Sequence, residues 1–486
     1  MNRTNTKFQV LSVALLACLL AAAGGCMKSD PPRFRLNMEG KDPSEVSPEK
    51  KQALVDSLYA LFGTPDEPYV VPESGLNLKK LQMAAGPAGA DNSGGRHGLF
   101  RQHCVHCHGV TGDGDGPTAL FLKPYPRDYR AGKYKFTSTG SSSLASKADL
   151  RKTIVDGING TAMPSFALLP ADEIDALTEY VKYLSIRGQT EFYIGDLIDS
   201  GETLPLSRQQ LVDDALLVAV DLWNEAEEPS SEVIPPKRFE KLADADDDGR
   251  LSRDEVTQWL ADNFSRIDAD GDGQISFAEQ EQPAAVSDPP ITAVKNQEGQ
   301  VASMAGDTDG DLQVSQQEFT DFVLGYFDKS DLDHDKYLSA DERLAASILA
   351  GKQLFATTGG CVKCHGPTAL GDNEEPIYDD WNAPKFNKNP EEMARLAKLF
   401  DLPIQQLNPR NLRLGLYRGG RRPVDIYRRL HAGIKGTPMP ALGPSGANPA
   451  KFKSEEIWHL VDFVRSLPYD PLSQPYRQTL VEKDRN

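Results

Sequence analysis

Two copies of the pattern Cys-x-x-Cys-His constrain this chain more than any other feature of its sequence. The first copy runs from Cys104 to His108 and the second from Cys361 to His365. This spacing is typical of c-type haem attachment, in which two thiols bond the porphyrin and the adjacent histidine ligates the iron. The sequence therefore predicts two covalently bound haems, held by Cys104, Cys107 and His108 and by Cys361, Cys364 and His365.

The remaining cysteines, Cys18 and Cys26, both lie at the N-terminus. No thiol is therefore left for a disulfide in the rest of the chain. Zinc is the alternative that paired Cys-x-x-Cys segments can bind. A tetrahedral zinc site would have to join two segments far apart in the sequence and would leave both adjacent histidines unused.

The N-terminus has the features of an export signal. Arg3 and Lys7 precede an apolar run, and small residues lead into Cys26. The segment resembles a bacterial lipoprotein signal, which implies cleavage and lipid attachment at Cys26, although Ala23 stands where that family usually carries leucine. The alternatives are ordinary cleavage without lipidation and retention as an uncleaved anchor. All three predict a periplasmic or otherwise extracytoplasmic location.

Hydrophobic periodicity and composition predict a mainly α protein with several segments. After the signal, a helical pattern from Ala53 to Phe62 is followed by a Gly/Ala-rich tract, which predicts a short packed helix on a tether. The segment before the acidic unit has apolar residues at helical spacing and predicts a packing helix. The expected units are the signal 1–26, the N-terminal helix and tether 27–92, the first haem unit 93–188, the connector 189–235, the acidic unit 236–345, the second haem unit 346–470 and the tail 471–486.

The two haem units form an internal repeat. Each Cys-x-x-Cys-His motif is followed by a Pro-Arg motif, at Arg127 and Arg410, and then by a Gly-x-x-Met-Pro turn that contains Met163 or Met439. Each unit ends in a predicted amphipathic helix whose apolar stripe can cover a haem edge. These stripes are Ile174, Leu177, Val181 and Leu184 in the first unit, and Ile457, Leu460, Val461, Val464 and Leu467 in the second.

With these motifs, each haem unit resembles a class I cytochrome c domain. The resemblance implies a small helical fold in which the haem lies between a proximal histidine and a distal methionine. It implies His108 and His365 as proximal ligands and Met163 and Met439 as distal ligands. An iron with both protein ligands has no vacancy for oxygen, peroxide or substrate, so it passes electrons only. The alternative role for either methionine is ordinary core packing.

Four other histidines compete with these ligands. His431 is the main rival because it lies in a predicted helix shortly before Met439, where a surface or edge position is expected. His103 and His106 are too close to the first pair of cysteines to reach the opposite face of the haem. We expect His459 to be half-buried in the last helix.

The second haem unit also contains an insert, with Trp381 and a predicted helix over 391–400, that would suit a docking face. Arg127 and Arg410 either pair with haem propionates or cap the turns after their prolines. A cationic cluster in the second unit either steers an acidic partner or forms a solvated helix face. Its members are Arg410, Arg413, Arg418, Arg421, Arg422, Arg428 and Arg429.

The acidic unit contains four segments with Asp-x-Asp-x-Asp and a glutamate at position twelve, the pattern of EF-hand calcium loops. The unit is therefore predicted to be a helix-loop-helix domain between the two haem domains, with calcium as a second cofactor. The expected ligands at positions one, three, five, seven, nine and twelve are Asp244, Asp246, Asp248, Arg250, Ser252 and Glu255; Asp268, Asp270, Asp272, Gln274, Ser276 and Glu279; Asp307, Asp309, Asp311, Gln313, Ser315 and Glu318; and Asp331, Asp333, Asp335, Tyr337, Ser339 and Glu342.

The loops depart from the usual EF-hand pattern in two ways. Position six is Gly249 and Gly273 in the first two loops but Leu312 and Lys336 in the others, where a left-handed backbone costs about 1 kcal/mol and should weaken binding. Consecutive loops are also close enough that one helix must serve each pair. We expect extracellular-type affinities of ~10⁻⁴ to 10⁻³ M, and a calcium role in stabilising the linking domain and fixing one haem unit relative to the other.

Together, these features predict an exported di-haem cytochrome that relays single electrons between respiratory-chain proteins. The chain has 53 basic and 71 acidic residues, which argues against nucleic acid or anionic lipid as a partner. Its expected partners are redox proteins, with membrane attachment through Cys26. Two alternatives remain open: a di-haem peroxidase with one open iron, and a calcium-responsive redox sensor or scaffold.

Overall fold

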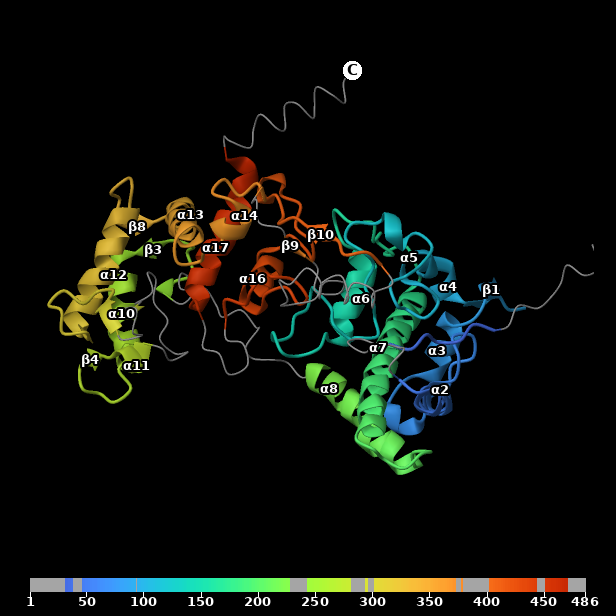
Figure 1. Cartoon of the computed structure of the whole chain (residues 1–486). Coiled ribbons are helices and arrows are strands. Elements are labelled where there is room, and N and C mark those ends of the chain that lie inside the picture. The colour runs from blue at the N-terminus through green and yellow to red at the C-terminus, as the bar shows by residue number, and fades with distance from the viewer. Residues whose placement is uncertain are drawn as a thin grey trace, which may run out of the picture.

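The protein is mainly α-helical, and its strands form only small two-stranded antiparallel sheets (Figure 1). We describe it from a computed structural model. The structure describes residues 31–37, 46–92, 94–227, 243–280, 293–295, 301–372, 377–378, 402–443 and 451–470. The predicted signal with Cys26, and the predicted insert with Trp381 and residues 391–400, lie outside these residues.

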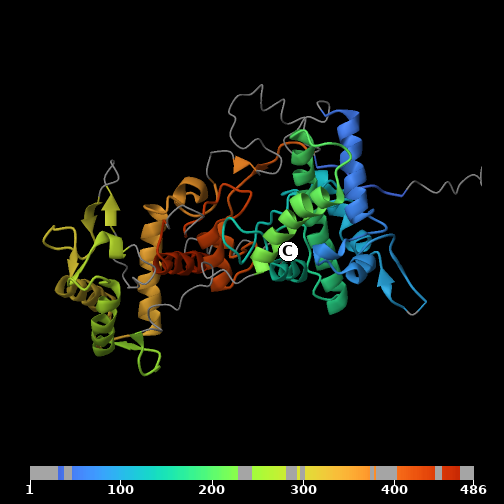
Figure 2. The same ribbon diagram turned by 90° about the horizontal axis from the view of Figure 1, so that it is seen from below.

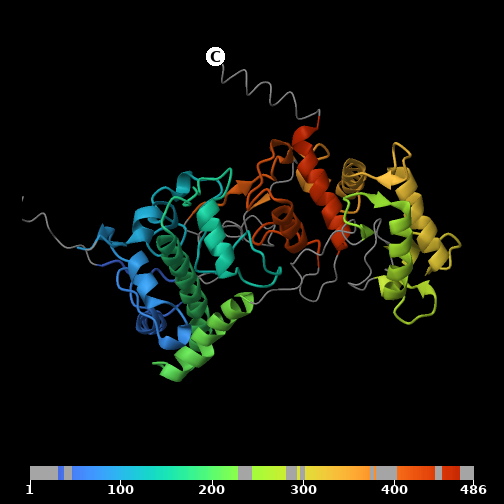
Figure 3. The same ribbon diagram turned by 180° about the vertical axis from the view of Figure 1, so that it is seen from behind.

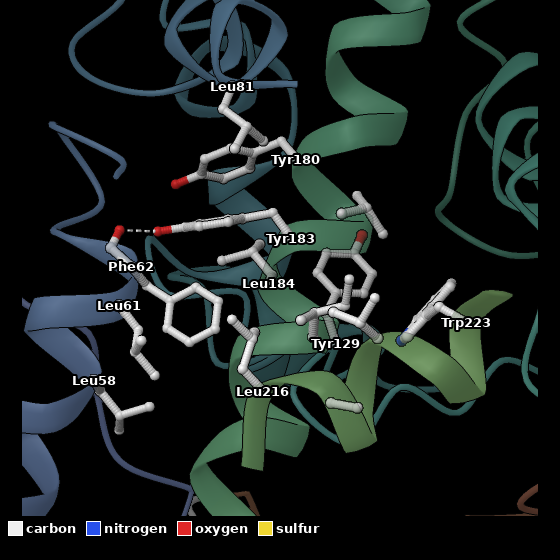
Figure 4. Packing of buried hydrophobic residues seen from close by; sticks show 14 of the residues in the cluster. Leu58, Leu61, Phe62, Leu81, Tyr129, Tyr180, Tyr183, Leu184, Leu216 and Trp223 are labelled. Carbon is white, nitrogen blue, oxygen red and sulfur yellow. Dashed lines mark hydrogen bonds between the residues drawn. The ribbon is translucent and has the colours of Figure 1, made fainter. Parts of the chain in front are cut away.

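The first haem unit shares one hydrophobic core with the segments before and after it (Figure 4). Tyr183 lies at the centre of this core, where its hydroxyl donates to the Phe62 carbonyl at 2.5 Å. The elements are α2 (Pro48–Phe62), η1 (Pro72–Ser74), α3 (Leu78–Ala84), β1 (Gly89–Ala90), β2 (Arg96–His97), α4 (Leu99–His103), α5 (Val105–His108), η2 (Ala119–Phe121), α6 (Lys147–Asp156), α7 (Ala171–Asp199), the π-helical segment η3 (Gln210–Leu216) and α8 (Leu217–Glu227).

The helix α7 is the spine of this core and crosses the predicted boundary at residue 188. Gly188 lies inside the helix, and a methyl group there would come within 2.2 Å of the Arg130 carbonyl oxygen. Glycine is therefore needed for close approach of the two backbones rather than to end the helix. The predicted connector therefore continues the helix of the haem unit, and α8 packs Trp223 into the same core. Neither α7 nor any other described helix is both long and apolar enough to cross a membrane.

The segment predicted to be a tether is also part of this core. Helices α2 and α3 pack against α7 and bury Leu58 and Leu81. Further upstream, Arg35 forms ion pairs with Asp113 and Asp115, at 3.3 and 3.0 Å. The tether prediction is therefore wrong for the described residues, because a Gly/Ala-rich composition does not reveal that the flanking apolar residues have a partner helix.

The second haem unit is built on fewer elements. These are α13 (Ala340–Ala356), α14 (Val362–His365), β9 (Ile377–Tyr378), β10 (Gln406–Leu407), η5 (Leu412–Leu414), α16 (Pro423–Ala432), α17 (Ser454–Ser466) and η6 (Leu467–Tyr469). Helix α13 crosses α17 closely, since a methyl group on Gly351 would lie 2.0 Å from the His459 carbonyl oxygen. The Ser347 hydroxyl donates to Asp462 at 2.7 Å and lies 2.9 Å from His459 Nδ1. His459 is fully buried rather than half-buried, because α13 covers it.

The acidic unit has its own hydrophobic core, formed mainly by two antiparallel loop-helix-loop segments. Its elements are β3 (Leu251–Ser252), α10 (Arg253–Ile267), β4 (Gln274–Ile275), α11 (Phe277–Gln280), β5 (Ala293–Lys295), β6 (Val301–Met304), β7 (Val314–Ser315), α12 (Gln316–Ser330) and β8 (Tyr337–Leu338). Strand β3 pairs with β8, and β4 pairs with β7. The first loop therefore pairs with the fourth and the second with the third.

This pairing corrects the expectation that consecutive loops form pairs. A single helix does serve both loops of each segment, as the sequence predicted. Each such helix has 15 residues and is ~22 Å long, so it holds its two loops at opposite ends. Loops can meet only across the two segments.

The three units follow one another in space in an order that differs from the sequence (Figures 1, 2 and 3). The acidic unit lies at one end, the second haem unit in the middle and the first haem unit at the other end. The acidic unit therefore lies between the haem domains in the sequence but not in space, so it does not act as a spacer between them. Its connection to the second haem unit is α13, which begins at the fourth acidic loop and ends shortly before Cys361.

Candidate haem and metal sites

The two Cys-x-x-Cys-His motifs fold into the same short helical turn. Cys104 and Cys361 cap α5 and α14, and their carbonyl oxygens accept hydrogen bonds from the amides of His108 and His365, at 2.9 and 2.8 Å. The two cysteines of each motif are three residues apart on a helix, so both lie on one face. The four thiols form no disulfide. Each turn therefore offers two thiols and one imidazole to the same haem.

Both motif histidines have one ring nitrogen fixed by the Pro-Arg loop. His108 Nδ1 lies 3.0 Å from the Arg127 carbonyl oxygen, and His365 Nδ1 lies 3.2 Å from that of Arg410. A carbonyl accepts only, so Nδ1 carries the proton and Nε2 keeps its lone pair for a metal. Burial lowers the pKa of His108 to about 4 and also lowers that of His365, which keeps both rings neutral near pH 7.

The predicted distal methionines lie in turns with the same hydrogen bonds. Ile158 donates to the Met163 carbonyl at 3.1 Å, and Ile434 donates to the Met439 carbonyl at 3.1 Å. Within each turn a threonine hydroxyl accepts from the methionine amide, at 3.2 Å in the first unit and 3.3 Å in the second. Local sequence therefore fixes both methionine turns in one conformation.

In the first unit, one cavity joins all the predicted haem ligands. Cys104, Cys107, His108 and Met163 line it together, along with the side chain of Arg127. Apolar residues of α6 and α7 line part of the remainder, as a porphyrin face requires; these are Leu150, Ile154, Leu177 and Val181. The residues present therefore fit a covalently attached haem, with His108 and Met163 available in the same cavity to ligate its iron.

Sequence reasoning missed two residues of this first site. Tyr129 stacks on the His108 ring, with centroids 4.5 Å apart and planes 18° apart. Its place two residues after Arg127 of the Pro-Arg motif was the available signal. Arg418, which belongs to the second haem unit, also lines the cavity. No sequence signal identifies it, because the contact depends on how the two units dock.

The second unit brings its predicted ligands to one core. Cys361 and Met439 both pack against the cluster that contains Phe355 and Phe463. The Phe355 ring lies 6.3 Å from the His365 ring. These contacts and the repeated hydrogen bonds fit a second haem held in the same manner.

The rival histidines do not displace these assignments. His431 is buried rather than at the surface, because its ring stacks on Tyr427 at 5.7 Å and a methyl group on Gly443 would contact it. His103 lines the first cavity beside its own cysteine, while its ring is 3.2 Å from Arg96.

The cationic cluster of the second unit faces the first haem unit. Arg421, Arg422, Arg428 and Arg429 line a cavity together with α6 of the first unit. Arg428 and Arg429 are half-buried there, whereas Arg421 and Arg422 are exposed, and steering of an acidic partner by the cluster stays a prediction. Arg127 and Arg410 also differ: the first side chain lines its own haem cavity, and the second donates to the Leu416 carbonyl at 3.0 Å.

The four acidic loops each gather carboxylates around one point. In every loop, three ligand oxygens lie within 4.8 Å of one another. The groups are Asp244, Asp246 and Glu255; Asp268, Asp270 and Glu279; Asp307, Asp309 and Asp311; and Asp331, Asp333 and Glu342. Hard oxygen donors at this density suit a divalent cation such as calcium.

The serines at position nine contact the glutamate at position twelve of the same loop. Ser252, for example, caps α10 and donates its hydroxyl to Glu255 at 2.8 Å. The other three loops repeat this contact. The serine therefore orients the glutamate.

Backbone strain differs among the loops. Position six is left-handed in all four, with φ values of +66° at Leu312 and +71° at Lys336. Position four is left-handed as well, which the sequence analysis missed, and carries glycine only in the second and third loops. The second loop is therefore unstrained at both positions, whereas the fourth, with His334 and Lys336, is strained at both.

Comparison with known proteins identifies the haem units. The cytochrome c family model matches residues 97–185 and 348–468. A chain of the reducing HAO-like protein complex of Kuenenia stuttgartiensis is similar over 76% of this chain and 94% of that chain, with 17% sequence identity and a TM-score of 0.38. A comparison with curated proteins finds no match.

The matched regions contain both ligand sets described above. The chain therefore carries two cytochrome c domains, which support two covalently bound haems c. These two domains indicate a haem-binding electron-transfer protein.

Proposed function

We propose that this protein relays single electrons between redox proteins and that a methionine ligates each haem iron. The observation that carries this proposal is the first haem cavity, which places Met163 together with His108. Haem iron supplies the one-electron chemistry. The protein's own residues fix the histidine tautomer, exclude water with the apolar walls of α6 and α7, and hold Met163 in its turn.

The optical spectrum of the oxidised protein tests this proposal. Two methionine-ligated ferric haems should give the weak near-infrared band, and the reduced protein should refuse carbon monoxide. Met163→Leu and Met439→Leu should each open one iron and remove about half of the band. Met304→Leu, in the acidic unit, is the matched control and should change neither property. A wild-type protein that binds carbon monoxide would instead favour the peroxidase alternative.

We also propose that calcium fills the acidic loops and supports the second haem unit. Helix α13 contains Glu342 of the fourth loop in its first turn and Phe355, which contacts His365, in its last turn. Ordering of the loop would thus stabilise the helix that covers the second haem. Calcium titration by calorimetry tests this, with Glu279→Gln and Glu342→Gln each expected to remove one site. A chain that takes up no calcium at millimolar concentration would contradict it.

For localisation, we propose an exported protein anchored through a lipid at Cys26. Residues 31–37 pack on the first haem unit, where the Asn37 amide donates to Glu191 and Phe34 lies over Arg187. A lipid at Cys26 would therefore place the first unit near the membrane. Cys26→Ala should release the protein from the membrane fraction, and Cys18→Ala, the matched control, should not. If both variants remain in the membrane fraction, the lipid anchor at Cys26 is refuted.

A further inference from the structure

The two haem units meet around an approximate two-fold axis. Gln405 Nε2 donates to the Leu122 carbonyl at 2.9 Å, and these two residues occupy equivalent positions before the two Pro-Arg motifs. Phe136 and Gly419 are also equivalent, and a methyl group on Gly419 would lie 2.6 Å from the Phe136 ring. Contact between equivalent positions is the mark of a two-fold interface.

Two arginines of the second unit contact the methionine turn of the first. A methyl group on Gly160 would come within 1.9 Å of Arg410 Nη2, so the guanidinium packs directly on this turn. Arg418 Nη2 lies 3.5 Å from the Gly160 carbonyl oxygen, and its side chain lines the first haem cavity. Gly160 begins the turn that ends at Met163, and its φ of +71° keeps the turn tight.

Arg410 links this turn to the other haem site. Its carbonyl oxygen accepts the hydrogen bond from His365, while its guanidinium lies against Gly160. Among the described residues, no carboxylate forms an ion pair with Arg410. Its guanidinium is held by the Leu416 carbonyl of its own unit, at 3.0 Å, and by the contact with Gly160 of the other unit.

The methionine turn of the second unit is held in the reverse direction. Lys435, within the turn that ends at Met439, donates to the Ser143 carbonyl and to Thr137 Oγ1, the latter at 3.3 Å. Both acceptors belong to the first unit, and Asp149 of that unit supplies the nearby negative charge. Lys435 is half-buried at this contact, so movement of the turn would break both of its hydrogen bonds to the first unit.

We propose that each haem unit holds the methionine turn of the other on its iron, with Arg410 and Lys435 as the positioning residues. This inference rests on the methionine ligation in the proposed function. Opening the contact between the units would free both turns, and the two irons would then become accessible together. On this view, each iron keeps its methionine ligand only while the two haem units are in contact. A partner that separates the units would convert an electron carrier into a ligand-binding haem protein.

The test uses the full-length protein and reads each haem separately. In a Met439→His background, the near-infrared band reports Met163 alone, because a bis-histidine haem lacks that band. Arg410→Gln, a change in the second unit, should then weaken the band of the first unit and raise carbon monoxide uptake there about tenfold. Arg413→Gln is the matched control, because it removes the same charge from the same unit and its contacts are with Thr368 and Asp470. Circular dichroism of each variant reports whether the fold is intact.

The reverse arm uses a Met163→His background and Lys435→Gln, which should open the second iron, with Thr137→Val as the variant on the opposite unit. An effect of Arg410→Gln on the first haem with none from Arg413→Gln supports the proposal. The proposal is overturned if the near-infrared band stays unchanged and carbon monoxide does not bind in Arg410→Gln, Arg418→Gln and Thr137→Val. This outcome would overturn it even if the wild type is methionine-ligated. A wild type without the band would instead defeat the proposed function itself.

Discussion

The two haem units carry the same ligand loops on different supports. In the first unit, α7 gathers α2, α3 and α8 into one continuous apolar core. In the second, α17 rests on α13, a helix that originates in the acidic unit, and α16 packs on α17. The proximal sides differ too, because His108 stacks on Tyr129 whereas the equivalent residue in the second unit is Leu412.

This comparison separates what places the ligands from what stabilises the unit around them. The hydrogen bonds within the Cys-x-x-Cys-His turns and methionine turns are the same in both units. The support, in contrast, is apolar in one unit and ends in carboxylate-rich loops in the other. We therefore expect the first unit to be insensitive to calcium and acid, and the second to depend on both.

The largest expected effect concerns the core of the first unit. Phe62 is 1% exposed and packs against the Tyr183 ring at 5.7 Å. Phe62→Ala should lower the free energy of unfolding of this unit by about 3–5 kcal/mol, measured by urea denaturation followed with circular dichroism. Tyr59→Ala, on the same helix but 63% exposed, is the matched control. An equal loss in both haem units would break the comparison.

Removal of calcium should act on the other unit. At a calcium concentration about ten times the Kd, each filled loop contributes about 1.4 kcal/mol to stability. A chelator should therefore lower the melting temperature of the acidic and second haem units and leave the first unchanged. Glu342→Gln should lower the melting temperature of the second haem unit more than Glu279→Gln, since α13 contains Glu342. Differential scanning calorimetry measures both, and a shift in the first unit's transition would contradict this expectation.

The proximal stacking partner should have a smaller effect. Tyr129→Leu gives the first site the residue of the second and should cost about 0.5–1.5 kcal/mol in the stability of the first unit. Leu412→Tyr is the reciprocal variant, and its effect measures whether the second site has room for a ring. If Tyr129→Leu leaves thermal unfolding unchanged, the stacking does not distinguish the two units.

Acid provides the weakest but most selective test. Hydrogen bonds from the Ser339 hydroxyl and amide lower the pKa of Glu342 from 4.5 to about 2. Because the folded pKa lies below the unfolded value, the contribution of Glu342 to stability is complete above about pH 4.5 and is lost as the pH falls toward 2. Stability of the second unit, followed by circular dichroism between pH 5 and 2, should therefore fall with pH. Glu342→Gln should flatten the slope; an unchanged slope would show that other carboxylates control it.

Much of each site could be predicted from the sequence because its determinants are local. The Cys-x-x-Cys-His turns and the methionine turns close their hydrogen bonds within a few residues, so their spacing alone indicates the geometry. The left-handed position six in the acidic loops was foreseen for the same reason. Tyr129, His431 and His459 show the limit: whether a ring is exposed, stacked or covered depends on a neighbouring element that the pattern does not name.

The sequence by itself determined the two haem attachment sites, the candidate axial ligands and the positions of the carboxylates in the acidic loops. The tertiary structure decided which acidic loops pair, that residues before and after the first haem unit share its core, and that the acidic unit lies at the end of the molecule. It also decided that Arg410, Arg418 and Lys435 contact the opposite haem unit. The physical reason is the separation of the interacting residues along the chain. Hydrogen bonds inside a turn join residues that are close in sequence, whereas packing joins surfaces that meet only after the chain has folded.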